Sequence, residues 1–261
     1  MCFNKEWSLG FTCTSLFFGG WVMSGKGIWK NLQPWQRWRI CLCFIYFASM
    51  EALQFFQYLV INDCNSMANI ILTALGYIHI CWQPLFSNIA LSALDFKNFE
   101  KKREEVWNFV FKFAFTSGLL MSARLLIPLI YDGPQNFIFT PCNHAEGICG
   151  EKTCTTNGLY HLKWEFKLLK SSYAFPNVAA HFLFMFVAPF LLGLRLQSII
   201  LFLTGPFISC LFRGEVSDGE RSAIWCFFSI AESFITIITS LLACRYQLKD
   251  STKNLKKSKK E

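Results

Sequence analysis

Seven long apolar runs constrain this chain more than any other feature of its sequence. Each run has between 17 and 28 residues, and a helix needs roughly 20 apolar residues to cross a hydrocarbon core about 30 Å thick. None of the runs alternates with the period of a barrel strand, which favours helices. We therefore predict an all-α polytopic membrane protein, a bundle of about seven transmembrane helices. The runs cover residues 7–23, 40–61, 67–94, 106–131, 173–194, 196–212 and 222–244.

The composition excludes an ordinary soluble domain. Of the 261 residues 53% are hydrophobic and 16% are charged, whereas about a quarter of the residues of a soluble domain are charged. We expect a seven-helix transmembrane domain at 1–244, with a cysteine-containing outer loop at 132–172, and a basic disordered cytosolic tail at 245–261. The fifth and sixth runs meet at Gly193, Leu194 and Arg195, where we expect a tight turn to divide them.

The distribution of Lys and Arg predicts the orientation in the membrane. Sixteen of the 25 Lys and Arg lie on one set of sides, including seven in the tail, and seven lie on the other set. Lys and Arg next to short loops are retained in the cytosol. We therefore predict an N-terminus that is outside or lumenal and a C-terminus that is cytosolic.

The basic tail indicates partners and a location. Much of the net charge of +8 lies in the tail and the cytosolic loops, so we expect contact with the lipid bilayer and with anionic lipid headgroups and no nucleic-acid binding. The last five residues, 257–261, resemble the K-x-K-x-x retrieval signal of endoplasmic-reticulum membrane proteins. The sequence does not predict an oligomeric state.

Five cysteines fall on the predicted outer side, where an oxidising environment favours disulfides. They are Cys2, Cys64, Cys142, Cys149 and Cys154. The last four are the disulfide candidates, although the spacing alone does not give their connectivity. Zinc binding with His144 is the alternative, but the paired cysteines two residues apart that are typical of zinc sites are missing.

Polar groups inside the predicted spans are the candidate functional residues, because each costs on the order of 3 kcal/mol at mid-bilayer and should face the bundle interior. Glu51, His79 and Glu232 fall near the midplane, and Gln83 shares a helix face with His79. Arg124 lies nearer the outer surface and is a natural counter-ion for a carboxylate.

These groups allow two interpretations. The first is that they form hydrogen bonds between helices and fix the packing of the bundle. The second is a polar cavity in which Glu51, Glu232 and His79 bind a ligand, relay protons or hold a metal. No phosphate loop, dinucleotide-binding glycine pattern or nucleophile elbow supports a particular enzyme class, and no cofactor is indicated.

Several short motifs resemble an uncharacterised family of multi-pass membrane proteins, classified only as a domain of unknown function. They span nearly the whole chain: the Met1-Cys2 start, M-E-A-L-Q at 50–54, Y-I-H-I-C-W-Q-P at 77–84, G-L-Y-H-L-K-W-E at 158–165, Gly205-Pro206 and A-I-W-C-F-F-S-I at 223–230. The resemblance implies a seven-helix membrane protein without an assigned activity. It also points to Glu51, His79, Gln83, His161 and Glu165, which lie within the motifs.

His161 and Glu165 are four residues apart, which places them on one face if the segment is helical. They would then either cap the polar cavity or anchor an interfacial helix together with Trp164.

The functional prediction is therefore a bundle with a polar mid-membrane core that binds or passes a small ligand, an ion or a proton. The alternatives are an intramembrane metal-dependent enzyme acting on lipid, with Glu51, His79 and Glu232 as weak metal-ligand candidates, and a structural or assembly protein. The sequence does not decide whether the chain is an enzyme.

Overall fold

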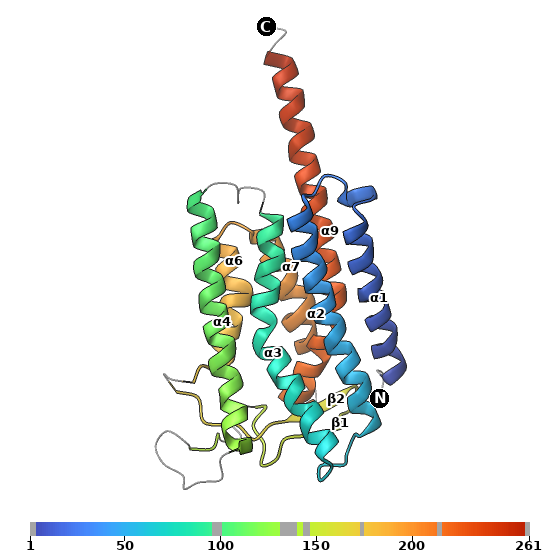
Figure 1. The fold of residues 1–261 in the computed structure, drawn as a ribbon, viewed down its shortest axis with the longest axis vertical. Coiled ribbons are helices and arrows are strands. Elements are labelled where there is room, and N and C mark those ends of the chain that lie inside the picture. Colours follow the sequence, from blue (N-terminus) through green and yellow to red (C-terminus); the bar gives the residue numbers. More distant parts are fainter. Residues whose placement is uncertain are drawn as a thin grey trace.

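The protein is a bundle of helices that run side by side, with a small β-hairpin at one end (Figure 1). The computed structural model describes residues 4–95, 101–130, 140–142, 147–172, 175–212 and 216–258, and only the backbone of residues 101 and 243–258. The longer helices are α1 (Lys5–Ser24), α2 (Pro34–Leu59), α3 (Met67–Leu94), α4 (Lys101–Ile130) and α9 (Asp218–Ser258).

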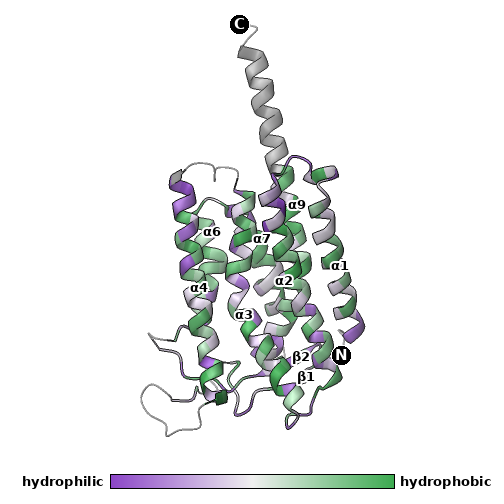
Figure 2. Ribbon diagram, viewed as in Figure 1, coloured by the Kyte–Doolittle hydropathy of each residue, from purple (hydrophilic) through white to green (hydrophobic). Residues whose placement is uncertain are grey.

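Four helices of the described residues are long and apolar enough to cross a membrane. They are α2, α3, residues Lys102–Ile130 of α4 and residues Asp218–Leu242 of α9. Two further apolar helical segments, Val178–Leu191 and Arg195–Leu211, are shorter. Hydrophobic residues cover the middle of the bundle, and hydrophilic residues gather at the start of α1 and of α4 (Figure 2). By length and composition, the helices fit a membrane protein.

Local signals explain where the first two helices begin and end. The Asn4 side chain caps α1 by accepting a hydrogen bond from the Trp7 amide at 3.2 Å. α1 ends at Gly25, whose φ of 64° is favourable for glycine. A capping box formed by Gln33 and Gln36, with Pro34 in the first turn, starts α2.

The segment between residues 178 and 211 folds back on itself at Gly193, as the sequence predicts. α5 (Val178–Phe182), the π-helix η3 (Leu183–Val187) and α6 (Ala188–Leu191) run in one direction. α7 (Arg195–Phe202), the π-helix η4 (Leu203–Phe207) and α8 (Ile208–Leu211) return. Gly193 allows the turn because its φ is 87°.

Prolines inside these helices free backbone carbonyl groups. Pro189 has no N–H to bond the carbonyl of Phe184, five residues earlier in the π-helical register. The Asn88 side chain of α3 supplies the missing donor at 2.7 Å, and it also donates to the carbonyl of Pro84 at 2.7 Å. Asn88 therefore joins α3 to the π-helical segment at the place where both helices are irregular.

The prediction of helix around His161 and Glu165 is wrong, and the all-α class omits a small sheet. Strands β1 (Cys154–Asn157) and β2 (Leu162–Glu165) form an antiparallel hairpin. The residues of β2 alternate between buried and half-buried, as the period of a strand requires. The alternating burial of the side chains therefore favours strand over helix in this segment.

The four candidate cysteines form two disulfides. Cys64, in the turn between α2 and α3, bonds Cys154 of β1, and Cys142 bonds Cys149. Both lie at the end of the bundle that holds the hairpin and the start of α1 (Figure 1). Cys2 and His144 lie outside the described residues.

At the other end of the bundle, α9 continues to Ser258 and extends beyond the ends of the other helices (Figure 1). The disordered tail at 245–261 stays a prediction, and residues 259–261 of the retrieval-like sequence lie outside the described residues.

The apolar core has two main parts. Near the hairpin, Trp164 and Phe166 pack with Tyr77 and Leu125. Further along the bundle, Trp29, Phe44 and Trp107 belong to a second cluster that also includes residues of α7 and α9. Polar side chains, among them Glu51, Gln54 and Glu232, are also buried in the interior of the bundle.

Candidate functional site

The predicted polar faces of α2 and α9 point into the bundle. Glu51 and Gln54 of α2 are fully buried, and Glu232, Thr236 and Ser240 of α9 are at most 2% exposed. Their spacing of three or four residues keeps each set on one side of its helix. The burial of Glu51 and Glu232 agrees with the expectation that polar groups within the predicted spans face the bundle interior.

Glu51 is a carboxyl group without a hydrogen-bond partner among the described residues. Its side chain is 0% exposed, and neither carboxyl oxygen accepts a hydrogen bond. The Ser8 hydroxyl of α1 is the polar side-chain group that faces the carboxyl group, but it does not meet the geometry of a hydrogen bond. Burying such a group costs free energy that an apolar side chain would not cost.

Glu232 is held more firmly, on α9. Trp225 Nε1, two turns earlier on the same helix, donates to Glu232 Oε2 at 3.3 Å, whereas Oε1 has no partner among the described residues. His181 of α5 packs edge-on against the Trp225 ring, with centroids 5.3 Å apart. Gly205 of η4 also lies against this group, because a Cβ there would come within 2.9 Å of both carboxyl oxygens.

Cys226 links the surroundings of the two carboxyl groups. Its thiol interacts electrostatically with Glu51 and Glu232, and Gln83 Nε2 of α3 donates to Cys226 Sγ at 3.4 Å. Three helices, α2, α3 and α9, therefore contribute polar side chains to one buried region. We call Glu51, Gln83, Cys226 and Glu232 the central polar cluster.

His79 does not join this cluster through the interactions of its ring. The imidazole stacks on Tyr46 with centroids 3.9 Å apart, and Nε2 donates to the Tyr46 carbonyl at 2.8 Å. The Tyr46 hydroxyl in turn donates to the His79 carbonyl. His79 thus ties α3 to α2. The described residues bring together no group of three His, Cys, Asp or Glu side chains that could hold a metal ion.

His161 lies in the hairpin turn and reaches into the bundle. Its Nε2 donates to Gln54 Oε1 at 3.0 Å, and its Nδ1 accepts from the Tyr58 hydroxyl at 2.7 Å. Burial lowers the pKa of His161 to about 3. The ring is therefore neutral at pH 7. It connects the hairpin to Gln54 of α2, which is one helical turn from Glu51.

Glu220 fixes the hairpin turn to the start of α9. Its buried carboxyl group accepts hydrogen bonds from the amides of Leu159, Tyr160 and His161 at 3.0, 2.5 and 3.0 Å. Gly158 must be small, since a Cβ there would come within 2.4 Å of the Glu220 side chain. Sequence reasoning missed Glu220, because its partners are backbone amides that carry no sequence signal.

Arg124 and Glu165 lie away from the central polar cluster. Arg124 Nε and Nη2 donate to the Leu169 carbonyl at 3.0 and 2.7 Å, and Nη1 donates to the Pro176 carbonyl at 3.4 Å. Arg124 therefore holds the chain at Leu169 and Pro176 against α4. Glu165 is partly exposed on β2 and pairs with Lys163 at 2.8 Å.

Comparison with known proteins gives a family and no assigned chemistry. The model of the Family of unknown function (DUF5765) matches residues 13–248. No curated protein and no solved structure matches the chain. The assignment of an activity therefore depends on the geometry of the polar interior.

Proposed function

The chain belongs to the Family of unknown function (DUF5765), and we propose that it is a multi-pass membrane protein whose central polar cluster takes up protons and passes them through the bundle. The observation that carries the proposal is the pair of buried carboxyl groups. Of the four oxygens of Glu51 and Glu232, three have no hydrogen-bond partner among the described residues.

Buried carboxyl groups of this kind are suited to carry protons. An isolated carboxylate in a medium of low dielectric constant is strongly disfavoured, whereas the neutral acid is tolerated. Ionisable side chains inside membrane bundles commonly mark ion pathways and proton relays. The Cys226 thiol is near enough to both carboxyl groups to interact with them electrostatically, and in this proposal it is the polar neighbour of a proton that moves between Glu51 and Glu232.

The proposed topology has seven crossings, with α5–α6 and α7–α8 as the two short ones. The start of α1 and the C-terminal part of α9 lie at opposite ends of the bundle (Figure 1), as an odd number of crossings requires. Both disulfides lie at the end that holds the start of α1, which supports an outside or lumenal position for that end. The basic tail would then contact anionic lipid in the cytosol, and retrieval to the endoplasmic reticulum is part of the same proposal.

Proton flux into liposomes tests the function. Purified protein is reconstituted with a pH-sensitive dye inside, and a potassium diffusion potential drives proton entry. We expect Glu51→Gln and Glu232→Gln each to lower the rate by about tenfold or more, because the amide keeps the side-chain shape but carries no proton. Glu165→Gln, on the partly exposed face of the hairpin, is the matched control and should conduct like the wild type.

Two results would contradict the proposal. Wild-type liposomes that are no more permeable to protons than protein-free liposomes would remove it. Glu51→Gln and Glu232→Gln variants that both conduct like the wild type would leave these residues the packing role of a structural or assembly protein.

The metal-dependent lipid enzyme has no supporting arrangement among the described residues, since His79 is engaged with Tyr46. That alternative predicts stoichiometric zinc or iron in the purified protein, lost in both Glu51→Gln and His79→Ala. Metal analysis by mass spectrometry of the three proteins distinguishes it from proton transfer.

A further inference from the structure

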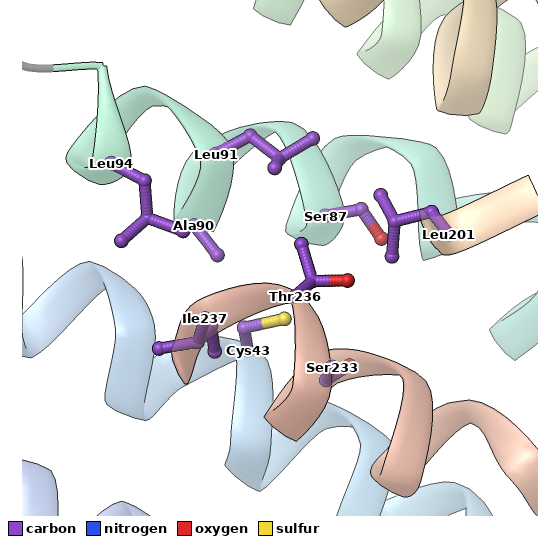
Figure 3. Close-up of a pocket in the computed structure, with 9 residues that line it drawn as sticks. All are labelled: Cys43, Ser87, Ala90, Leu91, Leu94, Leu201, Ser233, Thr236 and Ile237. Carbon is purple, nitrogen blue, oxygen red and sulfur yellow. The ribbon is translucent and has the colours of Figure 1, made fainter. Parts of the chain in front are cut away.

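A small cavity lies further along the bundle than Glu232, between α2, α3, α7 and α9. Its volume is about 20 Å³, measured as the space open to the centre of a water molecule. Apolar side chains form most of the wall, and four small polar residues complete it (Figure 3). The lining residues are Cys43, Ser87, Ala90, Leu91, Leu94, Leu201, Ser233, Thr236 and Ile237.

The Thr236 hydroxyl in this wall has no partner among the described residues. The residue is 2% exposed, and Oγ1 forms no hydrogen bond. The hydroxyl groups of Ser87 and Thr236 and the Cys43 thiol face the same space (Figure 3). A cavity of roughly 10–15 Å³ by this measure already holds a water molecule, provided that two or more polar groups surround it. An apolar cavity of the same size would stay dry.

Polar groups lie between the cavity and Glu232. The Cys43 thiol interacts with the Ser233 hydroxyl and electrostatically with Glu232, and both Cys43 and Ser233 line the cavity. Beyond Thr236, Ser240 is one turn further along α9, and Gln197 Nε2 of α7 donates to Ser240 Oγ at 3.0 Å. Polar groups therefore continue from Glu232 past the cavity toward the end of the bundle from which α9 extends.

We propose that this cavity is a binding site for an ordered water molecule, which carries protons between Glu232 and the Ser240–Gln197 pair. The inference rests on the proposed function. It deepens that function by describing the part of the route between Glu232 and the end of the bundle from which α9 extends. A water molecule suits this step because it can accept a proton on one side and donate one on the other. The Thr236 hydroxyl would hold it on the α9 side and the Ser87 hydroxyl on the α3 side.

Two variants on one helix test the site. Thr236→Val keeps the side-chain shape and removes the hydroxyl, and Thr239→Val makes the same change at a position that does not line the cavity. In the liposome assay we expect Thr236→Val to lower proton flux by about tenfold, because one step of the route loses its water. Thr239→Val should stay near the wild-type rate. Ala90→Val, which fills the cavity without touching a hydroxyl, should resemble Thr236→Val.

A cryo-electron microscopy map that resolves water gives the second readout and separates the two hypotheses. We expect density in the wild-type cavity within hydrogen-bond distance of Thr236 Oγ1, and none in Thr236→Val. An empty wild-type cavity, or undiminished flux through Thr236→Val, would overturn the inference while Glu51-dependent and Glu232-dependent flux kept the proposed function. Ordered water in a wild type that passes no protons would overturn the transfer role and leave only a structural water.

Discussion

His161 joins the hairpin turn to α2 and to the start of α9. Its two ring nitrogens bond Gln54 and Tyr58 of α2, and its amide donates to Glu220 at the start of α9. The neutral ring uses one nitrogen as donor and the other as acceptor, whereas a protonated ring would donate from both, so the Tyr58 hydroxyl would have to turn from donor to acceptor. The contacts of His161 therefore depend on its charge state.

We predict that acid destabilises the fold through His161. Burial lowers the pKa of His161 from 6.5 to about 3, so between these values the unfolded chain binds a proton that the folded chain does not. The neutral His161 ring therefore contributes its full stability to the folded state above pH 6.5, and this contribution is lost as the pH falls from 6.5 toward 3. Between pH 7.5 and pH 5 the loss should be about 2 kcal/mol, measured as the unfolding free energy in mixed detergent micelles.

His161→Gln is the control for this prediction, since glutamine offers a donor and an acceptor but does not titrate in this range. Its unfolding free energy should fall less than that of the wild type over the same pH interval. Equal losses in the two proteins would show that other groups cause the acid sensitivity.

Spacing within helices predicted some of these residues and missed others. Glu51, Gln83 and Glu232 are buried where the helical period places them. The His79 ring stacks on Tyr46 instead of meeting a carboxyl group, because the position of a residue along a helix does not fix which neighbour its side chain contacts. Glu220 bonds backbone amides, which every residue except proline has, and so no residue type could reveal it.

At the scale of elements, the hairpin is pinned to the α2–α3 turn by polar bonds and one disulfide. The Asn69 side chain of α3 donates to the Thr155 carbonyl and accepts from the Thr155 amide, both at 2.9 Å. Trp164 Nε1 donates to Gln57 of α2 at 3.1 Å, and Cys64 bonds Cys154. The hairpin thus closes one end of the bundle, next to the part of α2 that follows Glu51.

We predict that the Cys64–Cys154 disulfide contributes more stability than the Cys142–Cys149 disulfide. The two cysteines of the first pair are 90 residues apart in sequence, and those of the second are 7 apart. Closing a longer loop removes more entropy from the unfolded chain, so the cost of loss should be about 4 kcal/mol against about 2 kcal/mol. The double variants Cys64→Ser with Cys154→Ser and Cys142→Ser with Cys149→Ser are compared by thermal unfolding in detergent. A larger drop in Tm for the second variant would contradict this ranking.

The spacing of His161 and Glu165 is compatible with a helix, although these residues lie in the hairpin, and the reason is physical. Residues four apart lie on the same side of a helix and also on the same side of a strand, so the pair His161 and Glu165 could not separate the two. Residues two apart do separate them. Leu162 and Trp164 are buried, whereas Lys163 and Glu165 are half-buried. The sequence carries the same alternation, because the two buried residues are apolar and the two half-buried residues are charged.

At the scale of the whole molecule, the apolar runs located the helices well and their ends less well. The run at 67–94 coincides with α3 (Met67–Leu94), which has polar residues on both sides. α2 begins at Pro34, six residues before its run, because its first turns carry Gln36, Arg37 and Arg39. Hydropathy measures what lipid tolerates, whereas helix ends are set by caps, so the two agree only where a cap stands at the edge of the apolar run.

The number of crossings can be decided by the positions of the two ends of the chain. If only the four long apolar helices crossed the membrane, an even number of crossings would leave both ends on one side. If α1 and the two short segments cross as well, the ends lie on opposite sides, as they do in the bundle (Figure 1).

The natural chain contains no Asn-x-Ser/Thr sequence, so an engineered glycosylation acceptor reports its own location without background. We predict that an acceptor tag fused before residue 4 is glycosylated in microsomes and that the same tag fused after residue 258 is not. A tag inserted in the hairpin turn between β1 and β2 should behave like the N-terminal one, because both lie at the same end of the bundle. Glycosylation of both terminal tags, or of the C-terminal tag alone, would contradict the seven-crossing topology.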